Sequence, residues 1–191
     1  MQVYAVVYTS SGRFLLFWKL AKGYFFFDAK TGKGKIVKGG ANLNGGNDYA
    51  LPGGRREESE TVAAGAAREF LEETAADVRG LPVQERTFGR DFCAGYFRIE
   101  EKEIEGLLAR IQDPNLVSAM NASIDIEHGS ITGYAQIHTR YPSAPRDNEL
   151  ETGYLWSVHD EANWKVVLSW KNSPALGWYF DILDYLKTSI L

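Results

Sequence analysis

The chain has 191 residues, 45% of them apolar and 24% charged, which is the ordinary balance of one folded globular domain. The formal net charge of −4 excludes a general electrostatic attraction to nucleic acid, and the single cysteine, Cys93, excludes a disulfide within the chain. No apolar run is long enough to span a membrane, and the first residues lack the basic start of a signal peptide. We therefore expect a cytoplasmic protein with no membrane partner.

The part of the chain before residue 52 predicts mostly strands. Residues 3–8 and 14–18 are rich in β-branched and aromatic side chains, and the Ser-Ser-Gly between them at 10–12 predicts a strand pair. Residues 21–47 form a Gly-rich region in which we expect a strand, a turn, a second short strand and a flexible loop. The glycines match no phosphate-binding loop, because the final Gly-Lys-Ser/Thr of that pattern is absent.

An acidic stretch, GRREESETVAAGAAREFLEETAA at residues 54–76, follows a sharp Pro-Gly-Gly turn. In a helix, Glu69, Glu72 and Glu73 lie on one face, because they are spaced at i, i+3 and i+4. Like charges at this spacing repel one another, and no lysine in the helix offsets them. A divalent cation such as Mg²⁺ or Mn²⁺ would neutralise them, so the spacing favours a metal site over a solvated acidic face.

The neighbours of the three glutamates agree with a metal site. Glu60 precedes the helix and is able to turn back toward the same ion, and Arg68 is the only base in the helix and is placed to hold a carboxylate. Small and apolar residues on the opposite face predict packing on a sheet. These residues are Ala63, Ala66, Ala67 and Phe70.

The stretch resembles the Nudix box, G-x5-E-x7-R-E-U-x-E-E-x-G-U, in which U is apolar. The matching residues are Gly54, Glu60, Arg68, Glu69, Phe70, Glu72, Glu73 and Ala76. Ala75 stands where the family has glycine, a departure that concerns the end of the helix more than the chemistry. The resemblance implies an α/β fold, a Nudix-like α/β/α sandwich around a mixed sheet, and the alternation of predicted strands and helices permits it.

The region after the box predicts a core strand at 92–99 and then a helix at 100–112, where apolar residues recur at helical spacing. Residues 130–139 alternate as a strand does. Compared with a minimal Nudix core, the region from about 100 to 140 is an elaboration that could supply substrate specificity or a subunit contact.

The last part of the chain predicts a polar loop at 146–151, a strand at 154–158, a short strand at 164–168 and an amphipathic helix at 177–191. In many Nudix domains a carboxylate from such a loop reaches the metal or acts as a base. The resemblance therefore makes Glu149 and Glu151 candidates, and the alternative is that both only solvate the loop.

The resemblance implies one Nudix hydrolase domain over residues 1–191 that cleaves a pyrophosphate linkage in a nucleoside diphosphate joined to a group X. X is open among a sugar, ADP-ribose, a nucleoside triphosphate and a dinucleotide, and the resemblance allows a homodimer. The implied ligands of Mg²⁺ or Mn²⁺ are Glu60, Glu69, Glu72 and Glu73. The implied base is Glu69, Glu149 or Glu151, and Arg68 orients the carboxylates.

Two alternatives stay open. A nucleotide-sensing Nudix module without catalysis would have lost box carboxylates, and none is lost in this sequence. An enzyme that removes a cap or pyrophosphate from the RNA 5′ end would need a basic surface. The net negative charge of the chain argues against such a surface. Four nearby lysines keep the RNA alternative open: Lys30, Lys33, Lys35 and Lys38.

Overall fold

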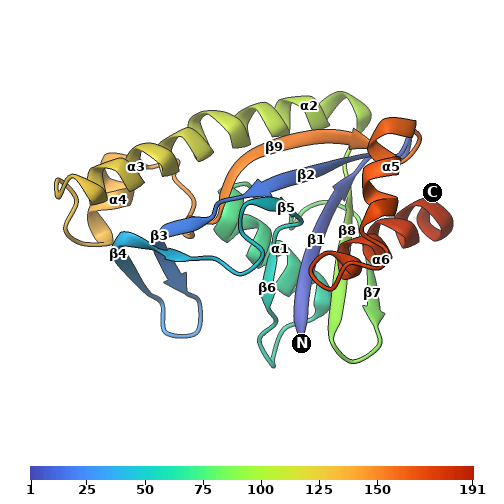
Figure 1. The fold of residues 1–191 in the computed structure, drawn as a ribbon, viewed down its shortest axis with the longest axis horizontal. Coiled ribbons are helices and arrows are strands. Elements are labelled where there is room, and N and C mark those ends of the chain that lie inside the picture. The colour runs from blue at the N-terminus through green and yellow to red at the C-terminus, as the bar shows by residue number, and fades with distance from the viewer.

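The computed structural model describes residues 1–191, and its centre is a mixed sheet of seven strands (Figure 1). The strand order is β5-β2-β1-β8-β7, with β6 added along β1 and β9 along β2. β1 and β8 are parallel, and the other pairs are antiparallel. The strands are β1 (Gln2–Tyr8), β2 (Arg13–Lys19), β5 (Asp48–Ala50), β6 (Gly53–Arg55), β7 (Val83–Phe88), β8 (Phe92–Arg98) and β9 (Leu150–Ser157).

Strands β1 and β2 separate soon after their turn, as Figure 1 shows. Their only paired residues are Tyr8 and Phe14, next to the turn. Beyond that point the start of β1 pairs with β6, and the end of β2 pairs with β5, while β9 pairs along the whole of β2. The sheet therefore opens between its two central strands, and helix α1 (Val62–Thr74) lies behind the opening.

Helices cover both faces of the sheet, which confirms the α/β/α sandwich. Along β1 the side chains alternate between two buried clusters, as a strand buried on both faces requires. One cluster packs against α1 and α2 (Glu101–Arg110), and the other packs against α5 (Glu161–Ser169) and α6 (Gly177–Tyr185). The last turn continues to Ile190 as a wider π-helix.

A lobe projects from one end of the sandwich, at the left of Figure 1. Its two strands, β3 (Lys22–Asp28) and β4 (Lys33–Asn42), form a separate hairpin. Helices α3 (Val117–Glu127) and α4 (Ala135–Arg140) cover the hairpin and share a third buried cluster with the fully buried Phe25. An irregular turn at Ile111–Leu116, which contains Pro114, joins α2 to α3.

The structure confirms most of the predicted elements: the strand pair at 3–8 and 14–18, the strand at 92–99, the helix at 100–112, the strand at 154–158 and the closing helix. The second strand of the 21–47 region is longer than predicted, since β4 has ten residues. Strand β7, which pairs along β8, was not predicted, because its residues are mostly exposed and carry no alternating pattern.

Two predicted strands are wrong. Residues 164–168 lie in helix α5, because Asp160 caps its first turn by accepting a hydrogen bond from the Asn163 backbone N–H at 2.9 Å. Residues 130–139 form a turn and helix α4, whose start is closed by the Gln136 side chain accepting from two backbone N–H groups. Capping hydrogen bonds thus outweigh the β-propensity of these segments. No helix of the structure is both long enough and apolar enough to cross a bilayer.

Candidate active site

Helix α1 carries the acidic face predicted from the spacing. Thr61 caps its start by accepting from the Ala64 N–H at 3.1 Å, and the helix ends at Ala75 with a left-handed φ of 61°. Its apolar face packs on the sheet through Val62, Ala66, Ala67 and Phe70. The sequence predicted Ala63 on the apolar face, but Ala63 is only half-buried. Val62 packs in the core instead.

Glu69, Glu72 and Glu73 are buried, with 7%, 3% and 3% of their surfaces exposed. Burial raises the pKa of Glu69 to about 7 and raises the pKa of Glu73 well above its usual range. Neighbouring carboxylates add to both shifts, among them Glu149. These groups are therefore held together at a cost in electrostatic free energy, which is the expected condition of a site that binds a cation.

Arg68 gathers the carboxylates on one side of the helix. Its guanidinium donates to Glu69 Oε1 at 2.8 Å and to Glu72 Oε2 at 3.3 Å. It also donates to both oxygens of Glu60, at 2.5 and 3.1 Å. Burial opposes ionisation of Glu60, but the bonds from Arg68 and the Glu57 N–H hold its pKa below the usual value. Arg68 thus fixes the positions of three of the four predicted ligands.

A cleft of about 620 Å³ opens onto Glu69 and Glu73. Two glycines allow the chain to approach these side chains: the Gly53 N–H donates to Glu73 Oε1 at 3.1 Å, and a Cβ on Gly54 would lie 2.7 Å from Glu69 Oε1. The far wall is aromatic, with Tyr4 in edge contact with Tyr179 and stacked on Trp178. The cleft therefore joins a charged floor to an apolar wall.

The structure separates the two loop candidates. Glu149 lines the cleft with Glu69 and Glu73, and its carboxylate lies 3.7 Å from Lys19 Nζ. Glu151 lines a different cavity. The reason is a bulge in the β2–β9 pair, where Lys19 faces Leu150 but Trp18 faces Thr152, so that Glu151 is an extra residue. A bulge interrupts the side-chain alternation and re-aims the residue it contains.

Two charged residues near the cleft were not predicted. Asp147 is buried, accepts from the Phe27 N–H at 2.6 Å, and has its pKa raised to about 8 by burial and nearby carboxylates. The sequence signal that could have identified Asp147 was its position in the polar loop at 146–151. Lys19, at the end of β2, gave no sequence signal, because only the pairing of β2 with β9 brings it to Glu149.

The residues fit a divalent cation chemically, although no group of three acidic, histidine or cysteine side chains converges as a coordination shell. Three of the carboxylates point to Arg68 instead. The Glu72 Oε1 atom, however, is buried without any hydrogen-bond partner. Such an atom is costly unless something compensates it, and a hard cation suits an all-carboxylate donor set.

A protein-family model described as "NUDIX domain" matches residues 2–119, which is more than half of the chain. The chain therefore belongs to the Nudix family, whose members are pyrophosphohydrolases, and the resemblance seen in the box is confirmed. No curated protein matches this chain.

Two solved structures are similar to this chain. A mutT/nudix family protein from Listeria innocua is 14% identical, with a TM-score of 0.50 over 99% of this chain and 92% of its own, and this likeness supports the fold alone. The MutT protein from Methanosarcina mazei Go1 is 25% identical over 51% of this chain and 59% of its own. Its TM-score of 0.27 is too low to bear on the fold.

Proposed function

We propose that this Nudix protein hydrolyses the pyrophosphate linkage of a small nucleotide, a nucleoside diphosphate joined to a group X, with the help of Mg²⁺ or Mn²⁺. The observation that carries the proposal is that the buried carboxylates Glu69 and Glu73 of α1 line one cleft together with Glu149, with Glu72 buried on the same helix. Glu69, Glu72 and Glu73 would hold the cation, with Glu60 assisting. When bound, a divalent cation neutralises the diphosphate charge and lowers the pKa of the attacking water.

The residues of the chain divide the remaining work. Arg68 keeps Glu60, Glu69 and Glu72 in fixed positions through its hydrogen bonds, so it is a positioning residue. A carboxylate committed to a cation is a poor base, because the cation lowers its pKa. Glu149 comes from outside the helix and faces the same cleft, so we propose that it takes the proton from the attacking water.

Glu151 was an equal candidate for the base from the sequence, as was Glu69. The placement of Glu151 in a different cavity argues against it, and the position of Glu69 among the proposed ligands favours Glu149 over it. The aromatic wall of the cleft, with Tyr4 and Trp178, supports binding of a flat or apolar part of X. We also propose that residues 1–191 act as one domain, in which the lobe of α3, α4 and the β3–β4 hairpin contributes to specificity.

The test is a panel of nucleotides incubated with the purified protein, with and without Mg²⁺ or Mn²⁺, and release of mono- and diphosphate products measured by chromatography. The panel includes sugar nucleotides, ADP-ribose, nucleoside triphosphates, dinucleotides and 5′-triphosphorylated RNA. We expect turnover of at least one small nucleotide that stops on chelation. Absence of turnover across the panel would favour a sensing module, and turnover of RNA alone would favour the RNA-directed enzyme.

A further inference from the structure

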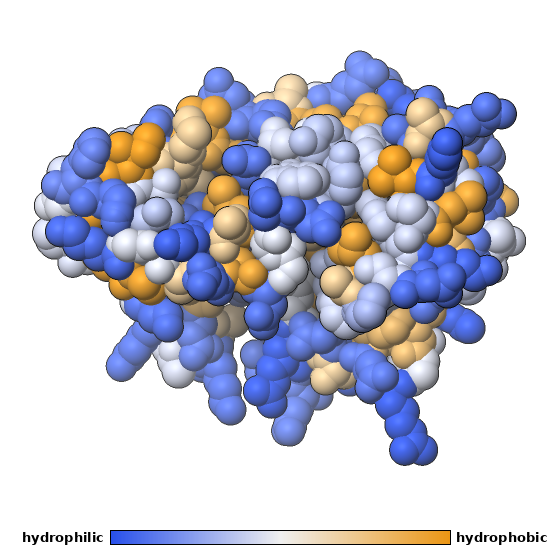
Figure 2. All heavy atoms as spheres, viewed as in Figure 1, coloured by the Kyte–Doolittle hydropathy of each residue, from blue (hydrophilic) through white to orange (hydrophobic).

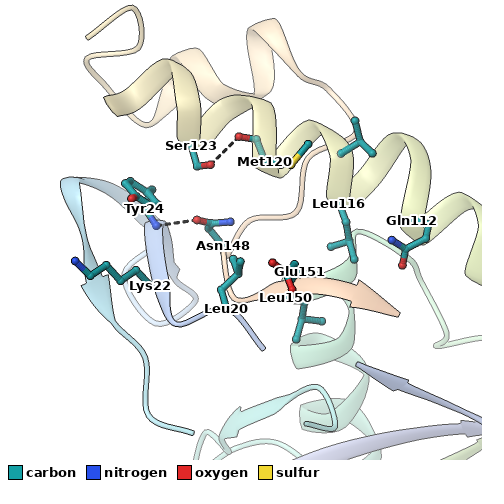
Figure 3. Close-up of a pocket in the computed structure, with 11 residues that line it drawn as sticks. Leu20, Lys22, Tyr24, Gln112, Leu116, Met120, Ser123, Asn148, Leu150 and Glu151 are labelled. Atoms are coloured by element: carbon teal, nitrogen blue, oxygen red, sulfur yellow. Dashed lines mark hydrogen bonds between the residues drawn. The ribbon is translucent and has the colours of Figure 1, made fainter. Parts of the chain in front are cut away.

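A second cavity, of about 270 Å³, lies where the lobe meets the sandwich, between α3, β3 and the start of β9 (Figure 3). Its wall is mostly apolar, from Leu20, Tyr24, Leu116, Val117, Met120 and Leu150. Figure 2 shows apolar residues at the surface over this end of the molecule, where Val117 and Met120 of α3 are exposed. The cavity is thus accessible and largely hydrophobic.

One buried amide points into this cavity. Asn148 is only 2% exposed, and its Oδ1 accepts from the Tyr24 backbone N–H at 2.8 Å. Because a backbone N–H can only donate, this bond fixes the oxygen toward Tyr24 and leaves the Nδ2 group on the other side. In Figure 3 that nitrogen points away from Tyr24, toward the side of the cavity where Leu116 lies. It has no hydrogen-bond partner in the protein.

Two charged side chains, Lys22 and Glu151, also line the cavity, and the two uncharged polar neighbours of Asn148 are engaged elsewhere. Gln112 donates to Thr152 Oγ1 at 2.9 Å and accepts from the Gly153 N–H. The Ser123 hydroxyl donates to the Met120 carbonyl at 2.6 Å, as the dashed line in Figure 3 marks. Asn148 therefore presents Nδ2 as a fixed hydrogen-bond donor that has no partner in the protein and is accessible from a mainly apolar cavity.

The cavity and the catalytic cleft lie on opposite sides of the same two strand ends. Lys19 and Glu149 line the cleft, while Leu20, Asn148 and Leu150 line the cavity. The two strand ends are joined by the Leu20 N–H, which donates to the Glu149 carbonyl at 2.8 Å. The cavity therefore borders the backbone that carries Glu149, and it shares no lining residue with the cleft.

We propose that this cavity binds a planar heteroaromatic ring that carries a hydrogen-bond acceptor, which is the chemistry of a nucleobase. The ring would pack among the apolar side chains, and its carbonyl or ring nitrogen would accept from Asn148 Nδ2. Cavities for drug-sized ligands start at about 300 Å³. A cavity of 270 Å³ suits a single ring system with part of its ribose rather than a whole dinucleotide.

The direct test uses adenosine, uridine and nicotinamide as probes, titrated into the metal-free protein and followed by NMR of side-chain amides and methionine methyls. We expect saturable shifts at Asn148 and Met120 with at least one probe. Bare nucleosides carry no diphosphate, so this result is independent of whether the protein proves to be a hydrolase. No saturable binding of any probe would overturn the proposal.

Two variants and a matched control locate the site. Met120→Trp should fill the cavity mouth from an exposed position, and Asn148→Asp should remove the donor while keeping the acceptor for Tyr24. Each should weaken probe binding about tenfold or more. Ile124→Trp, an equally large change on the exposed side of α3 but outside the cavity, should leave binding unchanged.

Melting temperatures check that each variant folds, and if Asn148→Asp does not fold, Met120→Trp decides the question alone. Unchanged binding in every variant that folds would overturn the proposal. Kinetics with the substrate found by the panel then show whether the ring belongs to the substrate or to a separate nucleotide. This last experiment rests on the proposed function. If the ring is the substrate's own, Met120→Trp raises KM; if it belongs to a separate nucleotide, free nucleoside changes wild-type turnover and Met120→Trp abolishes that response.

Discussion

The cleft and the cavity differ in almost every property, although one short segment, residues 148–151, lines both. The cleft gathers charge, with Glu69, Glu73 and Glu149 facing Lys19. The cavity is mainly apolar, with one fixed amide and the charged side chains of Lys22 and Glu151 in its lining. Just before β9, Asn148 lines the cavity and Glu149 lines the cleft, and the bulge at the start of β9 turns Glu151 away from Glu149. The comparison shows that two acidic residues of one loop need not share a function.

The largest effect is expected at the charged floor of the cleft. Glu73→Gln should lower kcat at least about a hundredfold, because a neutral amide binds a divalent cation far more weakly than a carboxylate does, and the cation contributes several kcal/mol of stabilisation. The amide oxygen can still accept from the Gly53 N–H, so the melting temperature should not fall. The check is kcat and thermal unfolding, with the exposed Glu103→Gln as control. Near-normal kcat would mean that the cation is held elsewhere.

The next prediction compares Glu149, which lines the cleft, with Glu151, which lines the cavity. Glu149→Gln should lower kcat about tenfold or more, within the usual range for loss of a general base, with little change in the Mg²⁺ concentration required. Glu151→Gln should keep kcat close to that of the wild type, because its side chain lies in the cavity. Both constants come from Mg²⁺ titrations of each variant and of Glu69→Gln. Equal effects at 149 and 151 would contradict the separation of cleft and cavity.

The buried acids should make stability fall as pH rises when no divalent cation is present. The pKa values of Glu69 and Asp147 are raised to about 7 and about 8, so the folded state binds more protons than the unfolded state between pH 4 and pH 8. The stabilisation is complete below the usual carboxyl range and is lost through pH 7 to 8. Each kcal/mol lost should lower the melting temperature by about 2–4 °C.

Thermal unfolding in chelator at pH 5.5, 7 and 8.5 measures this slope. Asp147→Asn keeps the acceptor for the Phe27 N–H and should flatten the slope, and added Mg²⁺ should stabilise most at pH 8.5. A melting temperature that rises steadily with pH in chelator would show that the acids are not desolvated as the structure has them.

The smallest effect is expected at the end of α1. Ala75 has a φ of 61°, a conformation that costs an alanine about 1 kcal/mol and a glycine nothing. Ala75→Gly should therefore raise the melting temperature by about 2–4 °C and leave kcat within a few-fold. Unfolding and turnover of this single variant test both points. A large gain in kcat would show instead that Ala75 limits the catalytic site.

The sequence by itself determined the Nudix box and the face of α1 that carries the carboxylates, because both depend on spacing within a few residues, and such local geometry is set by the helix repeat. The sandwich fold was expected from the resemblance to the Nudix family, and the element alternation only permitted it. The sequence also placed Glu149 and Glu151 in one loop, but gave no reason to prefer either.

Only the tertiary structure decided that preference, because the bulge depends on the pairing of β9 with β2, more than 130 residues apart in the chain. The same pairing brought Lys19 to Glu149, and the contact of Asn148 with Tyr24 depends on a hairpin 124 residues away. Helices α4 and α5 were missed because hydrogen bonds to the side chains of Gln136 and Asp160 near their starts outweighed the β-propensity of these segments. Which side chains meet across such distances is fixed by how the layers pack, and no local pattern in the sequence encodes it.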